Sequence, residues 1–119
     1  MTELYDRIYK ALTGRFTDMA VIHSCPQAPS VIPCVTFHIG NIAPFVYADG
    51  EPYAYEAEII TDIWHDSWES GAMLAADVKK TLTAAGFEYE KYEDNVTFNQ
   101  FNKRDASVRI TQRFKGITV

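Results

Sequence analysis

The chain has 119 residues, 47% of them hydrophobic, and its net charge at pH 7 is −5. This length suits a single domain over residues 1–119, which buries enough surface to fold without a metal ion or a disulfide. Nucleic-acid binding depends on lysine and arginine contacts to phosphates, and the negative charge argues against it. The apolar runs are far shorter than the roughly 20 residues that cross a bilayer. We therefore expect neither a membrane nor a nucleic acid as partner.

The N-terminal segment lacks the order of a signal peptide, which favours assembly in the cytoplasm. It predicts an amphipathic helix, because Leu4, Ile8 and Leu12 recur every four residues as one apolar stripe. Thr2 suits the N-cap of this helix, and Gly14 suits its C-terminal end.

Two short strands are predicted next, at residues 19–23 and 34–40. The residues between them include prolines at positions 26, 29 and 33. Because proline cannot donate to a sheet ladder, we expect residues 24–33 to be irregular.

Residues 41–52 are predicted to be a loop, since Pro44 interrupts their apolar run and positions 49 and 50 have the Asp-Gly sequence of a turn. Exposed aromatic residues, Phe45 and Tyr47 among them, would make this loop a contact arm. The alternative is a loop folded back on the core.

A long strand is predicted from residue 53 to residue 64, with side chains that alternate between two faces. One face is formed by Tyr55, Ala57, Ile59, Thr61 and Ile63. The opposite face is formed by Glu56, Glu58, Ile60, Asp62 and Trp64. The second face therefore combines three carboxylates with two apolar side chains.

A polar corner and a second helix follow the long strand. The helix has one apolar stripe, formed by Leu74, Val78 and Leu82 and flanked by Met73 and Ala85. Ser67 or Ser70 is expected to cap its start, and Gly86 to end it. Trp64 and Trp68 bracket the corner, where either can cap the core or anchor an interface.

The C-terminal third predicts strands at residues 87–93, 96–101 and 107–114, with turns at 94–95 and 102–106. Runs of strands separated by single helices indicate an α+β fold. We expect a two-layer sandwich with a mostly antiparallel sheet of about five strands, and with the N-terminal and central helices packed on one face.

One candidate for chemistry is a metal site at His23, Cys25, Cys34 and His38. On strands, residues two or four positions apart share a face, so a hairpin of these segments would bring the four side chains near tetrahedral zinc geometry. The sequence has no CxxC knuckle, and buried cysteines are often simply small apolar residues. We expect no metal or cofactor, and free thiols rather than a disulfide. A small metal-binding module or enzyme using these four residues remains the alternative.

The carboxylates of the long strand are a second candidate, for acid–base catalysis. Their regular alternation is that of the solvated side of a half-covered sheet. The sequence also lacks the GxSxG, Walker, GxGxxG and HExxH motifs. We therefore assign no catalytic residue and expect a protein that is not an enzyme.

Charge is distributed unevenly, with acids concentrated in residues 51–94 and bases near the C-terminus. The two regions either dock between copies of the chain or form separate solvated faces. The interface candidates are Phe45, Tyr47, Glu56, Glu58, Asp62, Trp68, Arg104, Arg109 and Arg113.

Taken whole, the chain resembles the phage tail-completion proteins, the tail-terminator or head–tail joining family. The resemblance lies in the order of segments LYDRIYKAL, SVIPCVTFHIG, YEAEIITDIW, HDSWESG, AMLAADVKKTL and VRITQRF. It implies a structural virion protein that forms a homo-oligomeric, commonly hexameric, ring at the head-proximal end of the tail. The ring caps the tail tube, ends its polymerisation and offers a docking surface to the head connector or the sheath end. The alternative within the same assembly is a neck adaptor.

Overall fold

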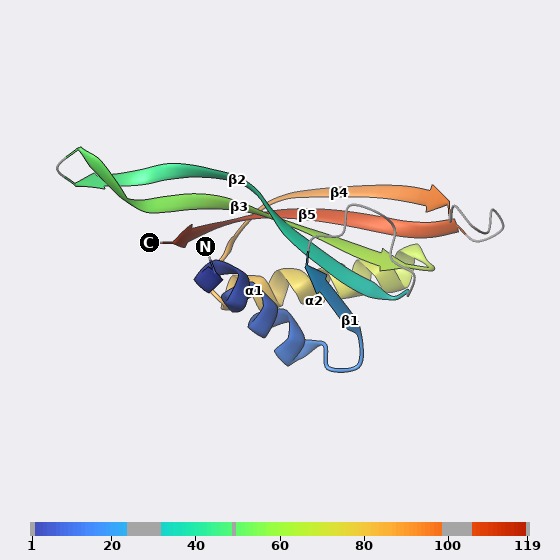
Figure 1. Ribbon diagram of the computed structural model, residues 1–119. Helices are drawn as coiled ribbons and strands as arrows, with labels where there is room; N and C mark the ends of the chain where they lie inside the picture. The colour runs from blue at the N-terminus through green and yellow to red at the C-terminus, as the bar shows by residue number, and fades with distance from the viewer. Residues whose placement is uncertain (1, 24–31, 49, 99–105, 119) are drawn as a thin grey trace.

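The computed structural model describes residues 2–23, 32–48, 50–98 and 106–118. Its elements are α1 (Thr2–Arg15), β1 (Ala20–His23), β2 (Cys34–Ala48), β3 (Glu51–His65), α2 (Trp68–Ala84), β4 (Glu88–Phe98) and β5 (Ala106–Thr118), as Figure 1 shows. The strands form one sheet in the order β1-β2-β3-β5-β4. Only β1 and β2 are parallel to each other, and the other neighbours are antiparallel.

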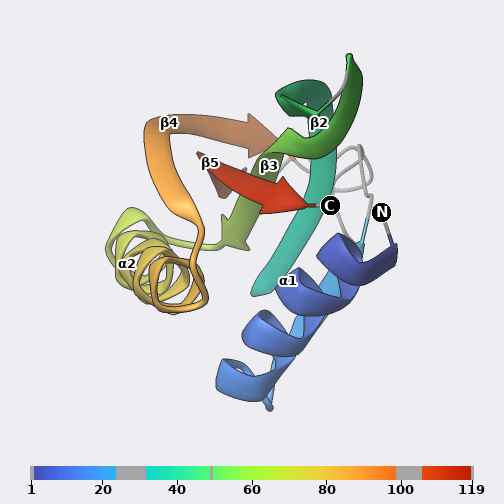
Figure 2. The same ribbon diagram turned by 90° about the vertical axis from the view of Figure 1, so that its left-hand side faces the viewer.

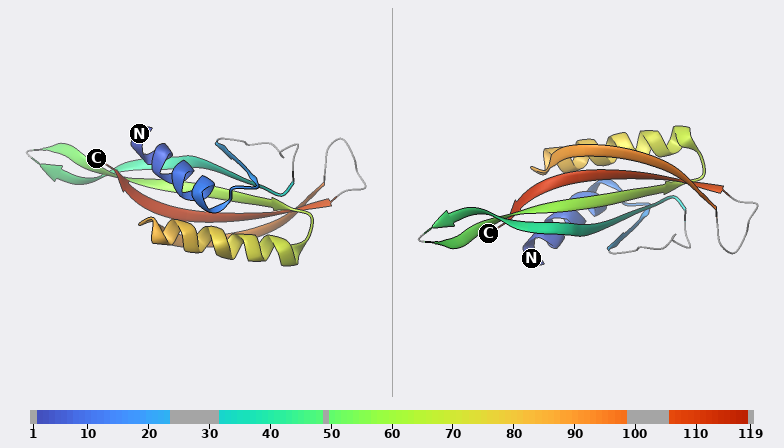
Figure 3. Two further views of the ribbon diagram at one scale, coloured as in Figure 1. Left: turned by 90° about the horizontal axis from the view of Figure 1, so that it is seen from below. Right: turned by 90° about the horizontal axis from the view of Figure 1, so that it is seen from above.

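Both helices lie on the same side of the sheet, with α1 nearer β1 and β2 and with α2 nearer β4 (Figures 2 and 3). The predicted α+β architecture is therefore confirmed. No helix in the described ranges is long and apolar enough to cross a membrane.

The core lies between the helices and one face of the sheet. It contains both predicted helical stripes together with sheet residues such as Val35, Ile59, Ile63 and Phe114. Each fully buried apolar side chain of this kind stabilises the fold by about 1.5–3 kcal/mol. The stripe of α1 continues to Phe16, which the sequence analysis did not include.

The ends of α2 follow the predicted signals. Ser67 is the N-cap, and its side chain accepts a hydrogen bond from the backbone N–H of Ser70 at 3.2 Å. Gly86 follows the helix with φ +97°, a conformation that glycine adopts without strain. α2 approaches the sheet closely at Gly71, where an added Cβ would lie 3.2 Å from the Ile110 side chain.

The prediction that residues 41–52 form a loop is wrong. β2 continues to Ala48 and pairs with β3 as a long hairpin. Pro44 is compatible with this strand because β1 pairs only with Cys34–Phe37, so that Pro44 lies on a free edge. Register shifts between Ile39 and Ala48 accommodate the irregular residues.

The predicted turn at residues 94–95 is also wrong. β4 runs without a break, with Asp94 paired to Ile110 and Asn95 paired to Arg109. A long neighbouring strand supplies these backbone hydrogen bonds, which outweighs the local turn preference of Asp and Asn. α1 likewise continues past Gly14 to Arg15.

The β2–β3 hairpin extends beyond the rest of the sheet (Figures 1 and 3). β5 pairs with β3 only from Tyr55 onward, so we define the arm as residues 41–48 and 50–55. The molecule measures 58 × 25 × 22 Å, and its radius of gyration is 15.4 Å. A compact domain of this length would have a radius of gyration of about 13.5 Å. The arm accounts for much of this elongation.

Candidate functional site

At one end of the sheet, the side chains on the face turned away from the helices are buried. Trp64 is 2% exposed, and its indole N–H donates to the Thr36 hydroxyl at 3.1 Å. The Thr111 hydroxyl donates to the Asp62 carboxylate nearby, and both groups are buried. The prediction that Asp62 belongs to a solvated carboxylate face is therefore wrong. Arg109 lies beside this cluster, with its guanidinium carbon 5.7 Å from the centre of the Trp64 ring.

The same face carries a charge ladder across β3, β5 and β4. We define it as Glu56, Glu58, Glu90, Lys91, Glu93, Arg113 and Lys115. Arg113 lies 3.1 Å from Glu58 and 3.4 Å from Glu93. Lys115 lies 3.4 Å from both Glu56 and Glu90. The acidic middle and the basic end of the chain are therefore neighbouring strands, and their charges pair within one molecule.

The ladder perturbs two pKa values. Lys91, and then Arg113, hold the pKa of Glu93 below its ordinary value. Glu56, and then Glu90, raise the pKa of Lys115 above its ordinary value. Glu93 is consequently ionised at neutral pH, which suits an ion pair better than a general acid.

The candidate metal ligands that the structure describes, His23, Cys34 and His38, do not share a face. His23 is on the helix-covered face, where its ring lies 4.2 Å from that of Tyr5 and 5.3 Å from that of Phe37. Cys34 and His38 alternate with core residues of β2 and therefore point to the opposite face. Cys25 lies outside the described residues, and with it the expectation of free thiols rather than a disulfide. Within the described ranges, no three metal-ligating side chains cluster.

The arm exposes apolar surface on an edge that carries no charge. Asn41, Ile42, Ala43 and Pro44 are exposed, with Ile42 at 37%. Residues 19–48 contain no Asp, Glu, Lys or Arg, so both β1 and β2 are free of formal charge. The opposite edge strand, β4, carries several charged residues. Proteins commonly protect exposed sheet edges with charge, proline or bulges, and β2 beyond β1 has Pro44 and register shifts but no charge.

The other predicted interface residues differ in their location and exposure. Trp68 is 41% exposed at the start of α2, in line with a surface role. The side chains of Phe45 and Tyr47, and the whole of Arg104, lie outside the described part of the chain. Glu58 and Arg113 are half-buried and paired with each other.

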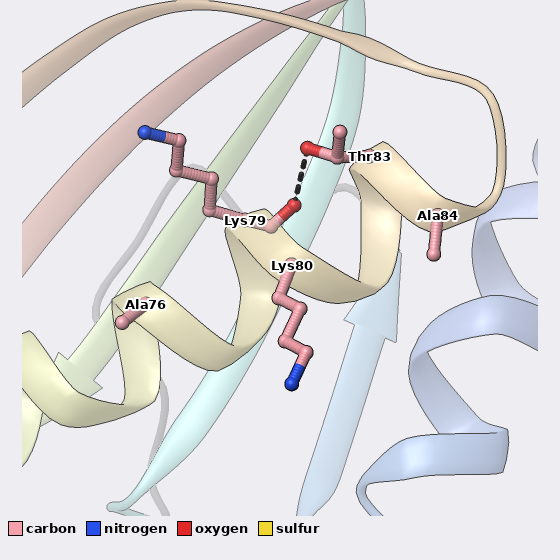
Figure 4. Close-up of a pocket in the computed structure, with 5 residues that line it drawn as sticks. All are labelled: Ala76, Lys79, Lys80, Thr83 and Ala84. Carbon is pink, nitrogen blue, oxygen red and sulfur yellow. Dashed lines mark hydrogen bonds between the residues drawn. The ribbon is translucent and has the colours of Figure 1, made fainter.

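Sequence reasoning missed a shallow depression on the outer surface of α2. The α2 depression is lined by Ala76, Lys79, Lys80, Thr83 and Ala84 (Figure 4). Its exposed lining surface is mostly apolar, although Lys79, Lys80 and Thr83 are among the five residues that form it. The Lys79 ammonium lies 4.1 Å from the centre of the Tyr89 ring. Lys80 is exposed and forms no ion pair with another described residue.

Comparison with known proteins adds no relative to this picture. No protein-family model matches the chain, and no curated protein sequence matches it.

Proposed function

We propose that this protein is a structural component of a phage or phage-like tail that self-associates into a ring at the head-proximal end of the tail tube. In this role it ends tube polymerisation and receives the head connector or the sheath end. The resemblance of the segment order supports the tail assignment, and the arm supports the assembly role.

The arm is the observation that carries the proposal. A two-stranded ribbon is marginally stable by itself in water, and the exposed Ile42 and Pro44 lie on a ribbon that extends beyond the last residue of β5. Docking on another molecule would bury this surface and stabilise the ribbon. An arm that contacts a different surface of the next copy makes a heterologous contact, which produces a ring when the rotation closes.

The charge ladder supports an apolar contact rather than a charge-driven one. Its acidic and basic side chains already neutralise each other within the chain. A neighbouring copy would therefore gain little by pairing with them, since exposed pairs contribute only about 0–1 kcal/mol.

A capping assay tests the tail assignment. Purified protein is added to polymerising tail tube protein, and tube length and the occupancy of tube ends are measured by electron microscopy. We expect shorter tubes with a ring at one end. A protein that ignores the tube but binds the portal complex is a neck adaptor. A protein that remains monomeric, or that binds neither the tube nor the portal complex, contradicts the proposal.

A further inference from the structure

The described residues of the arm include one charged side chain. Glu51 is exposed, forms no ion pair with another described residue, and is the only charged residue among the described positions of the arm. The other arm residues whose side chains the structure describes carry no charge. A surface that accommodates the arm is therefore expected to combine apolar side chains with a cation.

The α2 depression has this composition. Ala76 and Ala84 contribute apolar surface, and Lys80 lies between them along the helix, with an ammonium that pairs with no described residue (Figure 4). Lys79 differs from Lys80, because its ammonium already lies over the Tyr89 ring. Lys80 is thus the cation best placed to receive a carboxylate.

The arm projects away from α2 (Figure 1), so it does not reach the depression of its own chain. We propose that the arm of one copy docks in the α2 depression of a second copy, with Glu51 of the first paired to Lys80 of the second. This inference rests on the proposed function, because it assigns the two surfaces of the ring contact. Since the arm and the depression are different surfaces, the contact is heterologous, as a ring requires.

Charge reversal tests the pairing. Glu51→Lys and Lys80→Glu each place like charges in contact, and each is expected to raise the concentration at half-assembly by roughly three- to tenfold. The double variant restores the attraction with the signs exchanged. An equimolar mixture of the two single variants also restores it, because each arm then meets an opposite charge on the other variant. Assembly is measured by sedimentation velocity.

Lys10→Glu is the matched control, since Lys10 is an exposed lysine on α1 with no ion pair to a described residue. It makes the same charge change away from the proposed contact and is expected to leave assembly unchanged. Circular dichroism verifies that all variants fold, which is expected because each position is exposed. Glu51→Ala and Lys80→Ala provide milder variants that remove the pair without repulsion.

Each alternative outcome is decisive. If the wild-type protein assembles but neither reversal weakens assembly, or if the double variant is no better than the singles, the docking inference is wrong and the ring proposal stands. If Lys80→Glu leaves self-association intact but abolishes binding to tube protein, the depression belongs to the tube protein and the inference is also wrong. If the wild-type protein remains monomeric, both the inference and the proposed function are wrong.

Discussion

Gly116 illustrates how one missing side chain positions two elements. An added Cβ at this β5 position would lie 2.7 Å from the Phe87 ring and 3.2 Å from Ile59. Phe87 is buried directly after α2, and its other contacts include the Arg7 guanidinium, 4.8 Å from the ring centre. The absence of a side chain at Gly116 therefore lets the chain leaving α2 pack against the sheet.

We predict that Gly116→Ala lowers the free energy of unfolding by about 1–3 kcal/mol, because Phe87 must move to admit the methyl group. Gly14→Ala is the control, since a Cβ there meets nothing within 4 Å. That substitution is expected to stabilise α1 by about 0.5–1 kcal/mol. Urea unfolding measures both values, and an unchanged Gly116→Ala variant would show that Phe87 is not tightly held.

Glu93 provides a test of the charge ladder by titration. We predict that Lys91→Ala raises the pKa of Glu93 towards its ordinary value, because Lys91 is the largest cause of its lowering. Lys10→Ala is expected to leave that pKa unchanged. Carboxyl-carbon NMR measures the titration, and an equal pKa in wild type and Lys91→Ala would contradict the ladder geometry.

The two perturbed pKa values limit the contribution of the charge ladder to stability at opposite ends of the pH range. The pKa of Glu93 is lowered on folding, so its contribution to stability is present above the pKa of the unfolded chain and is lost as the pH falls through the folded pKa. The pKa of Lys115 is raised, so its contribution is present below the unfolded pKa and is lost as the pH rises through the folded pKa.

At the scale of elements, the arm is the part of the fold with the most specific expected role. Ile42 on the arm is 37% exposed, and Ile22 on β1 is 38% exposed. These two isoleucines form a matched pair, since both lie on uncharged strands and differ mainly in whether they belong to the arm.

We predict that Ile42→Asp weakens each contact between copies by about 2 kcal/mol, the cost of losing a buried aliphatic side chain, or roughly thirtyfold in Kd. Ile22→Asp is expected to leave self-association unchanged. Both variants should fold, because neither side chain belongs to the core. Equal weakening by the two variants in sedimentation equilibrium would indicate general surface hydrophobicity rather than an arm contact.

The sequence predicted those elements whose periodicity is local. Leu4, Ile8 and Leu12, and the stripe of α2, mark their helices without information from elsewhere in the chain. The extent of β2 was not predictable in this way, because Pro44 is a strand breaker except on a free edge. Whether an edge is free depends on the length of β1, which is a property of the whole sheet.

The faces on which the candidate site residues lie were not predictable for a related reason. Spacing in the sequence suggested that His23 lies near Cys34 and His38. The pairing of β1 with β2 and the alternation of side chains instead place His23 on one face of the sheet, and Cys34 and His38 on the other. Similarly, the alternation of β3 correctly grouped Asp62 with Glu56 and Glu58 on one face. It did not reveal that the Asp62 end of that face is buried and hydrogen-bonded to Thr111. Both outcomes depend on which residues pair across neighbouring strands. The alternation of side chains within one strand does not give that information.

At the scale of the whole molecule, charge distribution predicts how assembly responds to salt. The chain carries a net charge of −5, and copies of like charge repel each other at low ionic strength. The arm contact is mainly apolar, and a single exposed pair contributes only about 0–1 kcal/mol.

We therefore predict that the concentration at half-assembly stays constant or falls as sodium chloride is raised, because screening reduces the repulsion between copies. Light scattering over a salt series measures this concentration. Dissociation at high salt would show that charge pairs between copies, rather than the apolar arm, hold the assembly together.

Sedimentation velocity of the purified wild-type protein tests the central claim most directly. If the protein forms a closed ring, we expect one species at a fixed multiple of the 13.5 kDa chain mass. The resemblance to tail terminators predicts a sixfold multiple. The size of this species does not grow with concentration. A species that remains at the mass of one chain up to high micromolar concentration would contradict the account.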